Sequence, residues 1–333
     1  MSSTTVKAPS WQVNYSGVNI TADISGMVTS LMYTDRLTGG SGECEVVLED
    51  RDRLWQTSWY PQQGDVMSVA IGYEGQPLLQ CGEFQVDELE CKGPPDQITL
   101  RCIAAWITPT LRTRRSIGYE NVGLPAIAAS VAGRHGFELS EAPPMDDVSF
   151  ARVTQRHETD LEFLRRLART HGYNFTVRGT QLVFYNMATL ENSSPALEVA
   201  RTSVSEFTFV KRSLQVYKEA QVSYQAPLAK QLLSFSTNAQ EGVAGGDTLR
   251  LVMRCEDNEQ TRLKAQAALH DWNRFQRVGR IATVGNPALV AGVIIQVTGF
   301  GENGGNYLIE DARHRLTRRG GYTTSIAARR VGA

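Results

Sequence analysis

Hydrophobic and polar residues alternate along the first third of the chain with the two-residue period of β-strands. Four segments show this alternation or runs of β-branched residues: CEVVLED (44–50), DVMSVAIGY (65–73), GEFQVDELEC (82–91) and QITLRCIAA (97–105). Turn sequences rich in glycine and proline, such as TGGSG and KGPPD, separate them. Short strands at this spacing are typical of an antiparallel barrel or sandwich.

The pattern then changes to a helical period. Residues 124–136 predict a helix with Pro125 in its first turn. A second helix is predicted within 156–175, and the segment 174–186 predicts a hairpin of two short strands. The middle of the chain therefore combines helices with strands.

The last part of the chain returns to strands and contains one more helix. Residues 187–200 have the composition of a linker, and a helix is predicted over 257–277. Its expected buried side consists of Leu263, Ala267, Trp272 and Phe275. The closing strands are predicted at 292–300, 306–316 and 322–330.

One pattern occurs near both ends of the chain. A strand, a glycine-rich loop, a second strand and a third strand follow one another in the same order. At one constant offset, Gly82, Phe84, Val86 and Asp87 correspond to Gly305, Tyr307, Ile309 and Glu310. Any two three-strand meanders can be matched in part, but we interpret the match as an internal duplication. It predicts two related barrels in one chain.

The stretch RHETDLEFLRRLARTHGYNF (156–175) concentrates charges as an active site would. Thr159 and Glu162 form the T-x-x-E pattern of a capping box, in which each residue satisfies a backbone amide of the other. Acidic residues fill the first turn and arginines the later turns, as the helix dipole favours. We interpret the charges as the outer face of a capped helix rather than a catalytic site.

Other chemistry-bearing motifs are weak. GFGENG (299–304) matches the glycine pattern of a dinucleotide-binding loop, but a strand-like segment follows it where such a site needs a helix. No H-E-x-x-H, G-x-S-x-G or P-loop motif occurs. The five histidines are widely separated, and the five cysteines lack C-x-x-C spacing. The sequence predicts no catalytic residue, no cofactor and no metal site.

Composition changes this picture little. The 333 residues allow two or three domains, and 41% hydrophobic and 21% charged residues are ordinary for a soluble globular protein. The formal net charge of −1 provides no global field for nucleic acid. No segment approaches the roughly 20 apolar residues of a membrane span, and a signal peptide is not evident, so we expect no membrane anchor.

Arginines accumulate near the end of the chain. The run includes Arg313, Arg315, Arg318, Arg319, Arg329 and Arg330. It is either a solvated hairpin rim or an electrostatic contact with an acidic partner, and the sequence does not decide between them. We take Arg313, Arg315, Arg318 and Arg319 as the candidate partner interface.

The chain resembles the late control protein D family of contractile-tailed phages, which are baseplate hub proteins. That family is similar to the hub of T-even phages and to the N-terminal part of type VI secretion spike proteins. The resemblance spans nearly the whole chain. It is carried in order by GDVMSVAIGYEG, GEFQVDELECKGPPDQITLRCIAA, LPAIAASVAGRHG and ETDLEFLRRLARTHGYNFTVRGTQLVFY.

The resulting fold prediction is mainly β with α+β insertions: two tube-like antiparallel β-barrel domains, a small α/β domain and a helical insertion. The first barrel is expected over 1–105 and the α+β domain, with two helices and a hairpin, over 106–200. The second barrel is expected from 201–225 and 280–333. A small insertion with a hairpin and a helix is expected over 226–279.

The resemblance implies a structural, non-enzymatic hub in the virion baseplate, assembled in the host cytoplasm. Three copies would form a pseudo-sixfold ring that adapts the sixfold tail tube to a threefold spike. The implied partners are the tail tube or its initiator, baseplate wedge proteins and the tape measure protein, with phage DNA only passing through the lumen. Because the sequence contains no needle-like repeats, we expect a separate trimeric spike protein.

Two alternatives stay open at this point. A hub of a bacteriocin or of a type VI-like injection machine would share these sequence features. A cell-wall hydrolase of the tail tip would need a catalytic cleft with paired carboxylates, which the sequence does not indicate.

Overall fold

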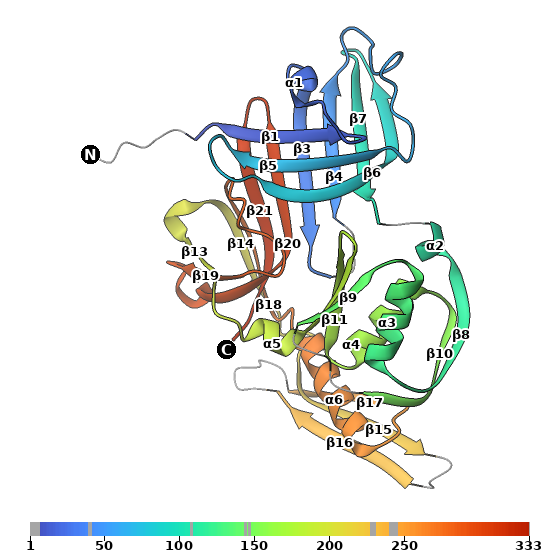
Figure 1. Ribbon diagram of the computed structural model, residues 1–333. Coiled ribbons are helices and arrows are strands. Elements are labelled where there is room, and N and C mark those ends of the chain that lie inside the picture. Colours follow the sequence, from blue (N-terminus) through green and yellow to red (C-terminus); the bar gives the residue numbers. More distant parts are fainter. Residues whose placement is uncertain are drawn as a thin grey trace.

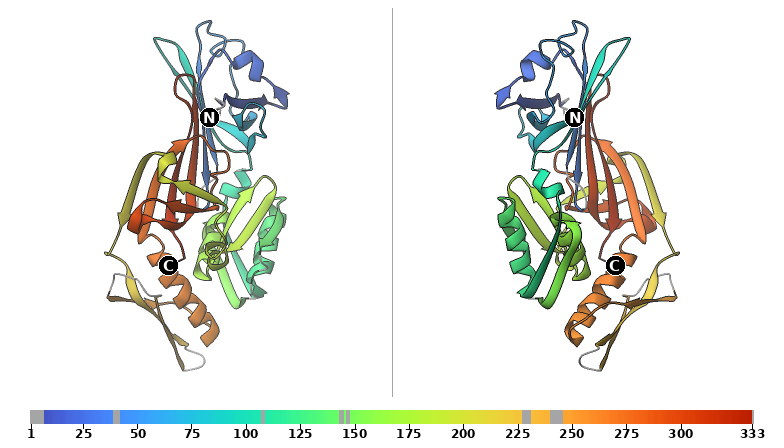
Figure 2. Two further views of the ribbon diagram at one scale, coloured as in Figure 1. Left: turned by 90° about the vertical axis from the view of Figure 1, so that its left-hand side faces the viewer. Right: turned by 90° about the vertical axis from the view of Figure 1, so that its right-hand side faces the viewer.

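The computed structural model describes residues 7–38, 42–106, 109–142, 145, 148–226, 231–239 and 246–332. The chain forms two β-barrel units, an α/β unit and a small sheet backed by a helix (Figure 1). The first barrel lies at the top of Figure 1, and the α/β unit and the small sheet lie at the opposite end. Figure 2 shows strands of both barrels side by side in one upright wall.

The first barrel follows from the alternating pattern near the start of the chain. Its inward side chains, among them Leu31, Val46 and Phe84, form one hydrophobic core. A short helix, α1 (Thr21–Ile24), packs beside β1. The strands are β1 (Pro9–Tyr15), β2 (Val18–Asn19), β3 (Val28–Arg36), β4 (Glu43–Glu49), β5 (Val66–Tyr73), β6 (Leu79–Lys92) and β7 (Gln97–Ala104).

The second barrel has a separate core that contains Ile281, Tyr307 and Ile326. Its strands are β13 (Leu197–Ala200), β14 (Val204–Lys211), β18 (Arg277–Val284), β19 (Ile294–Thr298), β20 (Gly305–Thr317) and β21 (Gly321–Arg330). GFGENG forms the turn between β19 and β20, including a short 3-10 helix at Gly301–Asn303. A strand follows these glycines, as the sequence predicted, where a dinucleotide-binding loop needs a helix.

The two barrels repeat the same strand order. The second barrel runs β14-β18-β21-β20 and the first runs β3-β4-β7-β6, and a β20–β3 pairing joins them in one 13-stranded sheet. Bulges between Val86 and Glu88 and between Ile309 and Asp311 fall at equivalent positions. Bulges bend and twist a strand, so each repeat curves at the same place. This agreement supports the duplication that the sequence indicated.

The α/β unit has its own core, in which Phe163 and Phe184 are fully buried. The strand β9 pairs in parallel with β12, whereas β11 and β12 form the predicted antiparallel hairpin. The strands are β8 (Arg114–Gly123), β9 (Glu138–Ala142), β10 (Ser149–Thr159), β11 (Tyr173–Arg178) and β12 (Gln181–Asn186). The helices are α2 (Pro109–Arg112), α3 (Leu124–Arg134), α4 (Asp160–Thr170) and α5 (Met187–Glu191).

The small sheet corrects one sequence prediction. Its strands are β15 (Tyr217–Ala226), β16 (Gln231–Asn238) and β17 (Asp247–Val252), and α6 (Asn258–Asn273) covers one face. The sequence assigned most of β15 to the second barrel, but β15 pairs with β16 and β17. Alternation fixes which face of a strand is buried and does not name its partner. Residues 227–230 and 240–245 of the predicted insertion lie outside the described residues.

Two further expectations were wrong. The segment 187–200 is not a linker, because it forms α5 and then β13, which pairs with β19. Trp272 and Phe275 are 45% and 38% exposed, so they do not form the buried side of α6. The buried residues of that helix are Gln260, Thr261, Lys264, Ala265, Ala267 and Leu269.

Candidate assembly interface

The capping residues selected from the sequence start α4. Thr159 Oγ1 accepts a hydrogen bond from the backbone nitrogen of Glu162 at 3.2 Å. Glu162 Oε2 accepts one from the backbone nitrogen of Thr159 at 2.8 Å. This backbone hydrogen bond lowers the pKa of Glu162 below its usual value. Thr159 and Glu162 therefore act on the fold of the α/β unit.

Asp160 does not lie on the outer face of α4, contrary to the sequence interpretation. It is fully buried, and Arg134 Nη1 lies 2.8 Å from each carboxylate oxygen. His135 Nε2 lies 2.7 Å from Asp160 Oδ2, and Gln155 Nε2 lies 2.9 Å from Asp160 Oδ1. Burial raises the pKa of Asp160, but the hydrogen bonds from Gln155, His135 and Arg134 outweigh it and lower the pKa.

This cluster has a superficial likeness to a catalytic triad. The Thr110 hydroxyl lies 3.5 Å from His135 Nδ1, and His135 Nε2 contacts Asp160. A triad carboxylate must be available to stabilise a histidine cation, whereas Arg134 already contacts both oxygens of Asp160. We therefore interpret the cluster as a buried ionic link between α3 and α4.

The large sheet exposes a face rich in charges of both signs. Arg101 on β7 forms ion pairs with Glu45, Glu88 and Glu90. Cross-strand register places Arg315 in the same row as Glu45 and Arg101. Arg313 is also exposed, two positions earlier on the same strand. Two of the arginines selected as a partner interface therefore belong to a mixed-charge sheet face.

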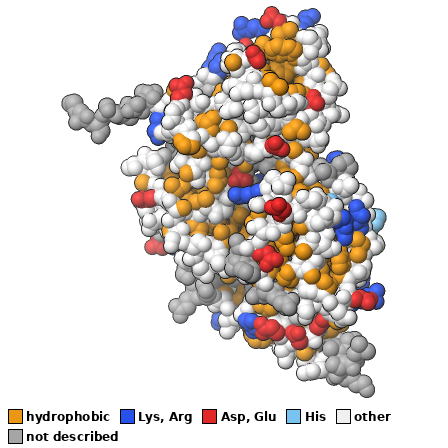
Figure 3. All heavy atoms as spheres, in the orientation of Figure 1, with side chains coloured by type: hydrophobic (Ala, Val, Ile, Leu, Met, Phe, Trp, Pro, Cys, Tyr) orange, Lys and Arg blue, Asp and Glu red, His pale blue; other side chains and the backbone are white. Residues whose placement is uncertain are grey.

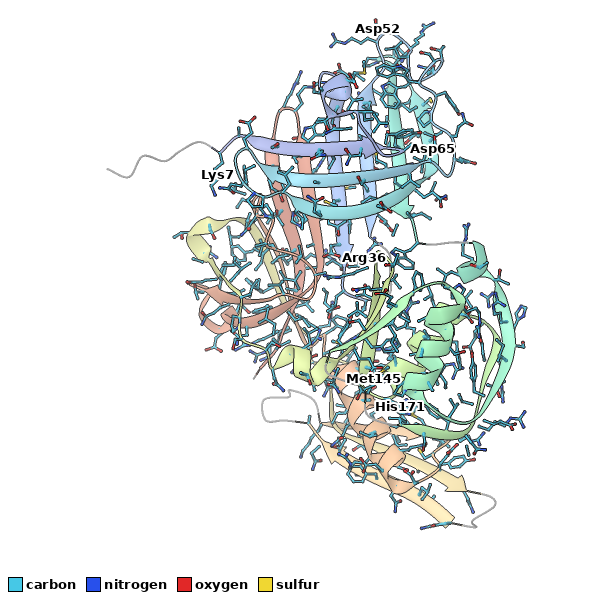
Figure 4. All side chains as sticks on the ribbon, in the orientation of Figure 1. Lys7, Arg36, Asp52, Asp65, Met145 and His171 are labelled. Carbon is cyan, nitrogen blue, oxygen red and sulfur yellow. The ribbon has the colours of Figure 1, made fainter. Side chains whose placement is uncertain are left out.

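The other two selected arginines lie at the tip of the β20–β21 hairpin. Arg318 Nη1 lies 3.0 Å from Glu49 Oε1, and Arg319 is exposed. The loop after β4 presents Trp59 and Tyr60, which are 41% and 49% exposed, and charged side chains of both signs lie at this end of the molecule (Figures 3 and 4). Exposed tryptophan, tyrosine and arginine side chains are typical of protein interfaces.

The remaining arginines of the run do not belong to that surface. The Arg329 side chain is 1% exposed and lies between Glu191 at 2.6 Å and Glu310 at 2.5 Å. Arg330 Nη1 donates to the carbonyl oxygen of Glu302 at 3.0 Å. The sequence could not separate buried from exposed arginines, because both occur on strands of the same hairpin.

Among the described residues, β14 and the second half of β6 each have an edge without a ladder partner, as do the short strands β2 and β13. β14 pairs with β18 on one side only. β6 pairs with β5 through its first half, but residues 88–92 pair only with β7. Phe207 and Val210 on β14 are 41% and 42% exposed. Open edges offer unpaired backbone groups to another strand, and sequence reasoning alone did not identify them.

A cavity of about 600 Å³ lies where α5, α6 and the end of β21 meet. Its lining includes His270 and Glu191, whose Nε2 and Oε2 atoms are 2.8 Å apart, and Arg329. Glu191 thus contacts both His270 and Arg329. Among the described residues, no cluster of histidine, cysteine, aspartate and glutamate could hold a metal ion, and no helix is long and apolar enough to cross a membrane.

Comparison with known proteins gives the family. The sequence profile of the phage tail baseplate hub (GPD) family matches residues 64–320. The chain is 32% identical over 176 residues to a probable baseplate hub protein of Escherichia phage P2, covering 53% of this chain and 45% of that protein. The corresponding protein of Escherichia phage 186 is 29% identical over 177 residues, with the same coverage. The matched segment thus spans less than half of each of these relatives.

Solved structures share the fold. The 43 kDa tail protein of prophage MuSo2 from Shewanella oneidensis has a TM-score of 0.75 at 15% identity, covering 97% of this chain and 98% of that chain. A tail protein from Neisseria meningitidis has a TM-score of 0.71 at 12% identity, covering 97% and 96%. An Escherichia coli component of the type VI secretion system has a TM-score of 0.58 at 13% identity, covering 92% and 74%.

Proposed function

Because the chain belongs to the phage tail baseplate hub (GPD) family, we propose that three copies of it form the hub ring of a contractile phage tail. The carrying observation is the repeated strand order in a single sheet that ends in open edges. Each copy contributes two related barrel units, so three copies give six similar units around one axis.

Such a ring adapts one symmetry to another. The six barrel units would meet a sixfold tail tube, because they are alike in strand order. The α/β unit and the small sheet occur once per copy and so would repeat three times around the ring. They suit a spike of threefold symmetry. The hub would act through this geometry and would catalyse no reaction.

The charged sheet face would line the lumen of the ring. Arg101 is paired with Glu45, Glu88 and Glu90, and Arg313 and Arg315 add positive charge nearby. A lining of both signs holds DNA less strongly than a purely basic one, since affinity for DNA grows with the number of phosphates neutralised. DNA could therefore pass through without being retained.

The proposed partners follow from this arrangement. They are a separate trimeric spike protein, the tail tube or its initiator, baseplate wedge proteins and the tape measure protein. The protein would be a virion component assembled in the host cytoplasm. The tip with Arg318, Arg319, Trp59 and Tyr60 is the proposed contact with one of these neighbours.

The type of particle is a second question. The likeness to a type VI secretion component supports a second candidate, a hub in a bacteriocin or a type VI-like injection machine. A tail-tip hydrolase is less well supported, because the buried Asp160 cluster is occupied by Arg134 and Gln155.

The test is the symmetry of the assembled particle, imaged by electron cryomicroscopy. We expect three copies arranged about a threefold axis at the junction of tube and spike. A hub layer with six copies, or a particle that places this chain outside the junction, would refute the proposal. Measuring whether particles purified from the producing strain contain a genome would distinguish a phage from a bacteriocin.

A further inference from the structure

Two of the strands with open edges, β14 and β6, are the repeat counterparts of the two strands that join the barrels inside one copy. In the common strand order, β14 occupies the place of β3, and β6 occupies the place of β20. The bulges shared by β6 and β20 fix the alignment of one pair. Bulges between Val28 and Ser30 and between Val204 and Glu206 fix the other. Each residue pair of the internal β20–β3 joint therefore has a counterpart pair on β6 and β14.

Side chains on β3, which has a neighbouring strand, are buried, whereas their counterparts on β14, which lacks that neighbour, are exposed. Leu31 and Thr34 on β3, next to β20, are 0% and 5% exposed. Their counterparts on β14 are Phe207 and Val210, which are 41% and 42% exposed. Large apolar side chains at these positions favour a strand that covers them. A second strand in the place of β20 would do so.

We propose that β14 of one copy pairs antiparallel with β6 of the next copy, in the register of the internal β20–β3 joint. This inference rests on the proposed ring and specifies how it closes. In the internal joint Asp311 lies opposite Arg36, Arg313 opposite Thr34, and His314 opposite Tyr33. The transferred pairs are Glu88 opposite Arg212, Glu90 opposite Val210, and Cys91 opposite Phe209.

The charges fit this register. The internal joint places Arg36 Nε 3.9 Å from Asp311 Oδ1. In the transferred pair, Arg212 takes the place of Arg36 and Glu88 takes the place of Asp311, so the positive and negative charges keep their positions. Lys211 ends β14 and Arg212 follows it, so this edge is positive, whereas Glu88 and Glu90 on β6 share one ion-pair partner, Arg101, and leave that edge negative. Opposite charges on facing edges favour this register over one that brings like charges together.

A cysteine cross-link tests the register. The variant carries Val210→Cys and Glu90→Cys in a Cys91→Ser background, so that the exposed native thiol does not interfere. After mild oxidation of assembled particles, we expect covalent dimers and trimers on a non-reducing gel, because directly opposed residues lie roughly 5 Å apart at Cβ. The control pairs Val210→Cys with Lys92→Cys, which are displaced by two residues and should cross-link far less.

The possible outcomes distinguish failure of the proposed strand register from failure of the proposed ring. Threefold particles in which the matched pair fails to cross-link, or cross-links no better than the displaced pair, would overturn the register and leave the ring intact. Particles without a threefold ring of this chain would overturn both proposals. The same micrographs provide this distinction, since they report symmetry independently of the gel.

A charge exchange provides a second readout. Arg212→Glu should reduce incorporation into particles by roughly tenfold, since it places like charges across the joint. Adding Glu88→Arg to the same chain should restore incorporation, because the pair is then reversed while Arg101 keeps its ion pairs with Glu45 and Glu90. Full incorporation of the single variant, or no recovery in the double variant while circular dichroism shows both folded, would contradict the proposed pair.

Discussion

At the scale of single residues, the start of α4 depends on one hydroxyl. Thr159→Ala removes the acceptor for the backbone nitrogen of Glu162 and should lower the free energy of unfolding by about 1 kcal/mol. Thermal or urea unfolding measures the loss. Thr159→Ser keeps the hydroxyl and serves as the control. Equal stability of the alanine variant and the unmodified protein would show that the helix does not need this cap.

Buried histidines make stability depend on pH. Burial lowers the pKa of His171 and of His314 from 6.5 to about 4. Between these values the unfolded chain binds protons that the folded protein excludes, so stability should fall as the pH decreases from about 6.5 to about 4. The loss could reach about 3 kcal/mol for each histidine. Urea unfolding at a series of pH values measures it.

The control for this prediction is an exposed histidine. His157→Asn is the matched substitution, because His157 is exposed and asparagine tolerates its positive φ of 50°. His171→Gln should make the curve less steep, whatever its effect at neutral pH. If the free energy of unfolding of the His171 variant depended on pH as steeply as that of the unmodified protein, His171 would not be a source of the pH dependence.

At the scale of elements, α6 shows how burial differs from the sequence expectation. Leu269 is 5% exposed, so Leu269→Ala should cost about 2–5 kcal/mol through lost burial and the cavity left behind. Trp272 is 45% exposed and makes an edge contact with Tyr217, so Trp272→Ala should cost only about 1 kcal/mol. Denaturant unfolding of both variants measures the order. The reverse order would mean that α6 packs through its aromatic end.

At the scale of the whole molecule, the hairpin tip should matter for assembly and not for folding. Arg318→Glu with Arg319→Glu should reduce incorporation into particles, because an acidic partner surface would then be repelled. Arg152→Glu, on the exposed surface of the α/β unit, is the matched control. Quantitative mass spectrometry of purified particles measures incorporation. Normal incorporation of the tip variant would remove these arginines from the proposed interface.

The sequence by itself determined the elements whose causes are local. The capping box of α4, the start of α3 near Pro125 and the hairpin of β11 and β12 depend on neighbours a few residues away. The duplication could also be recognised from the sequence, because equivalent bulges and loops require similar residues at a constant offset. The resemblance to a hub family followed from the order of these local patterns.

Only the tertiary structure decided which strand pairs with which and which charges are buried. The alternation in β15 suits either the barrel or the small sheet, and α6 selects the small sheet by covering Ala220 and Val222. Asp160 and Arg329 look like surface residues in the sequence, but partners from distant segments let them be buried. Alternation sets the buried face of a strand, whereas the choice of partner depends on residues far apart along the chain.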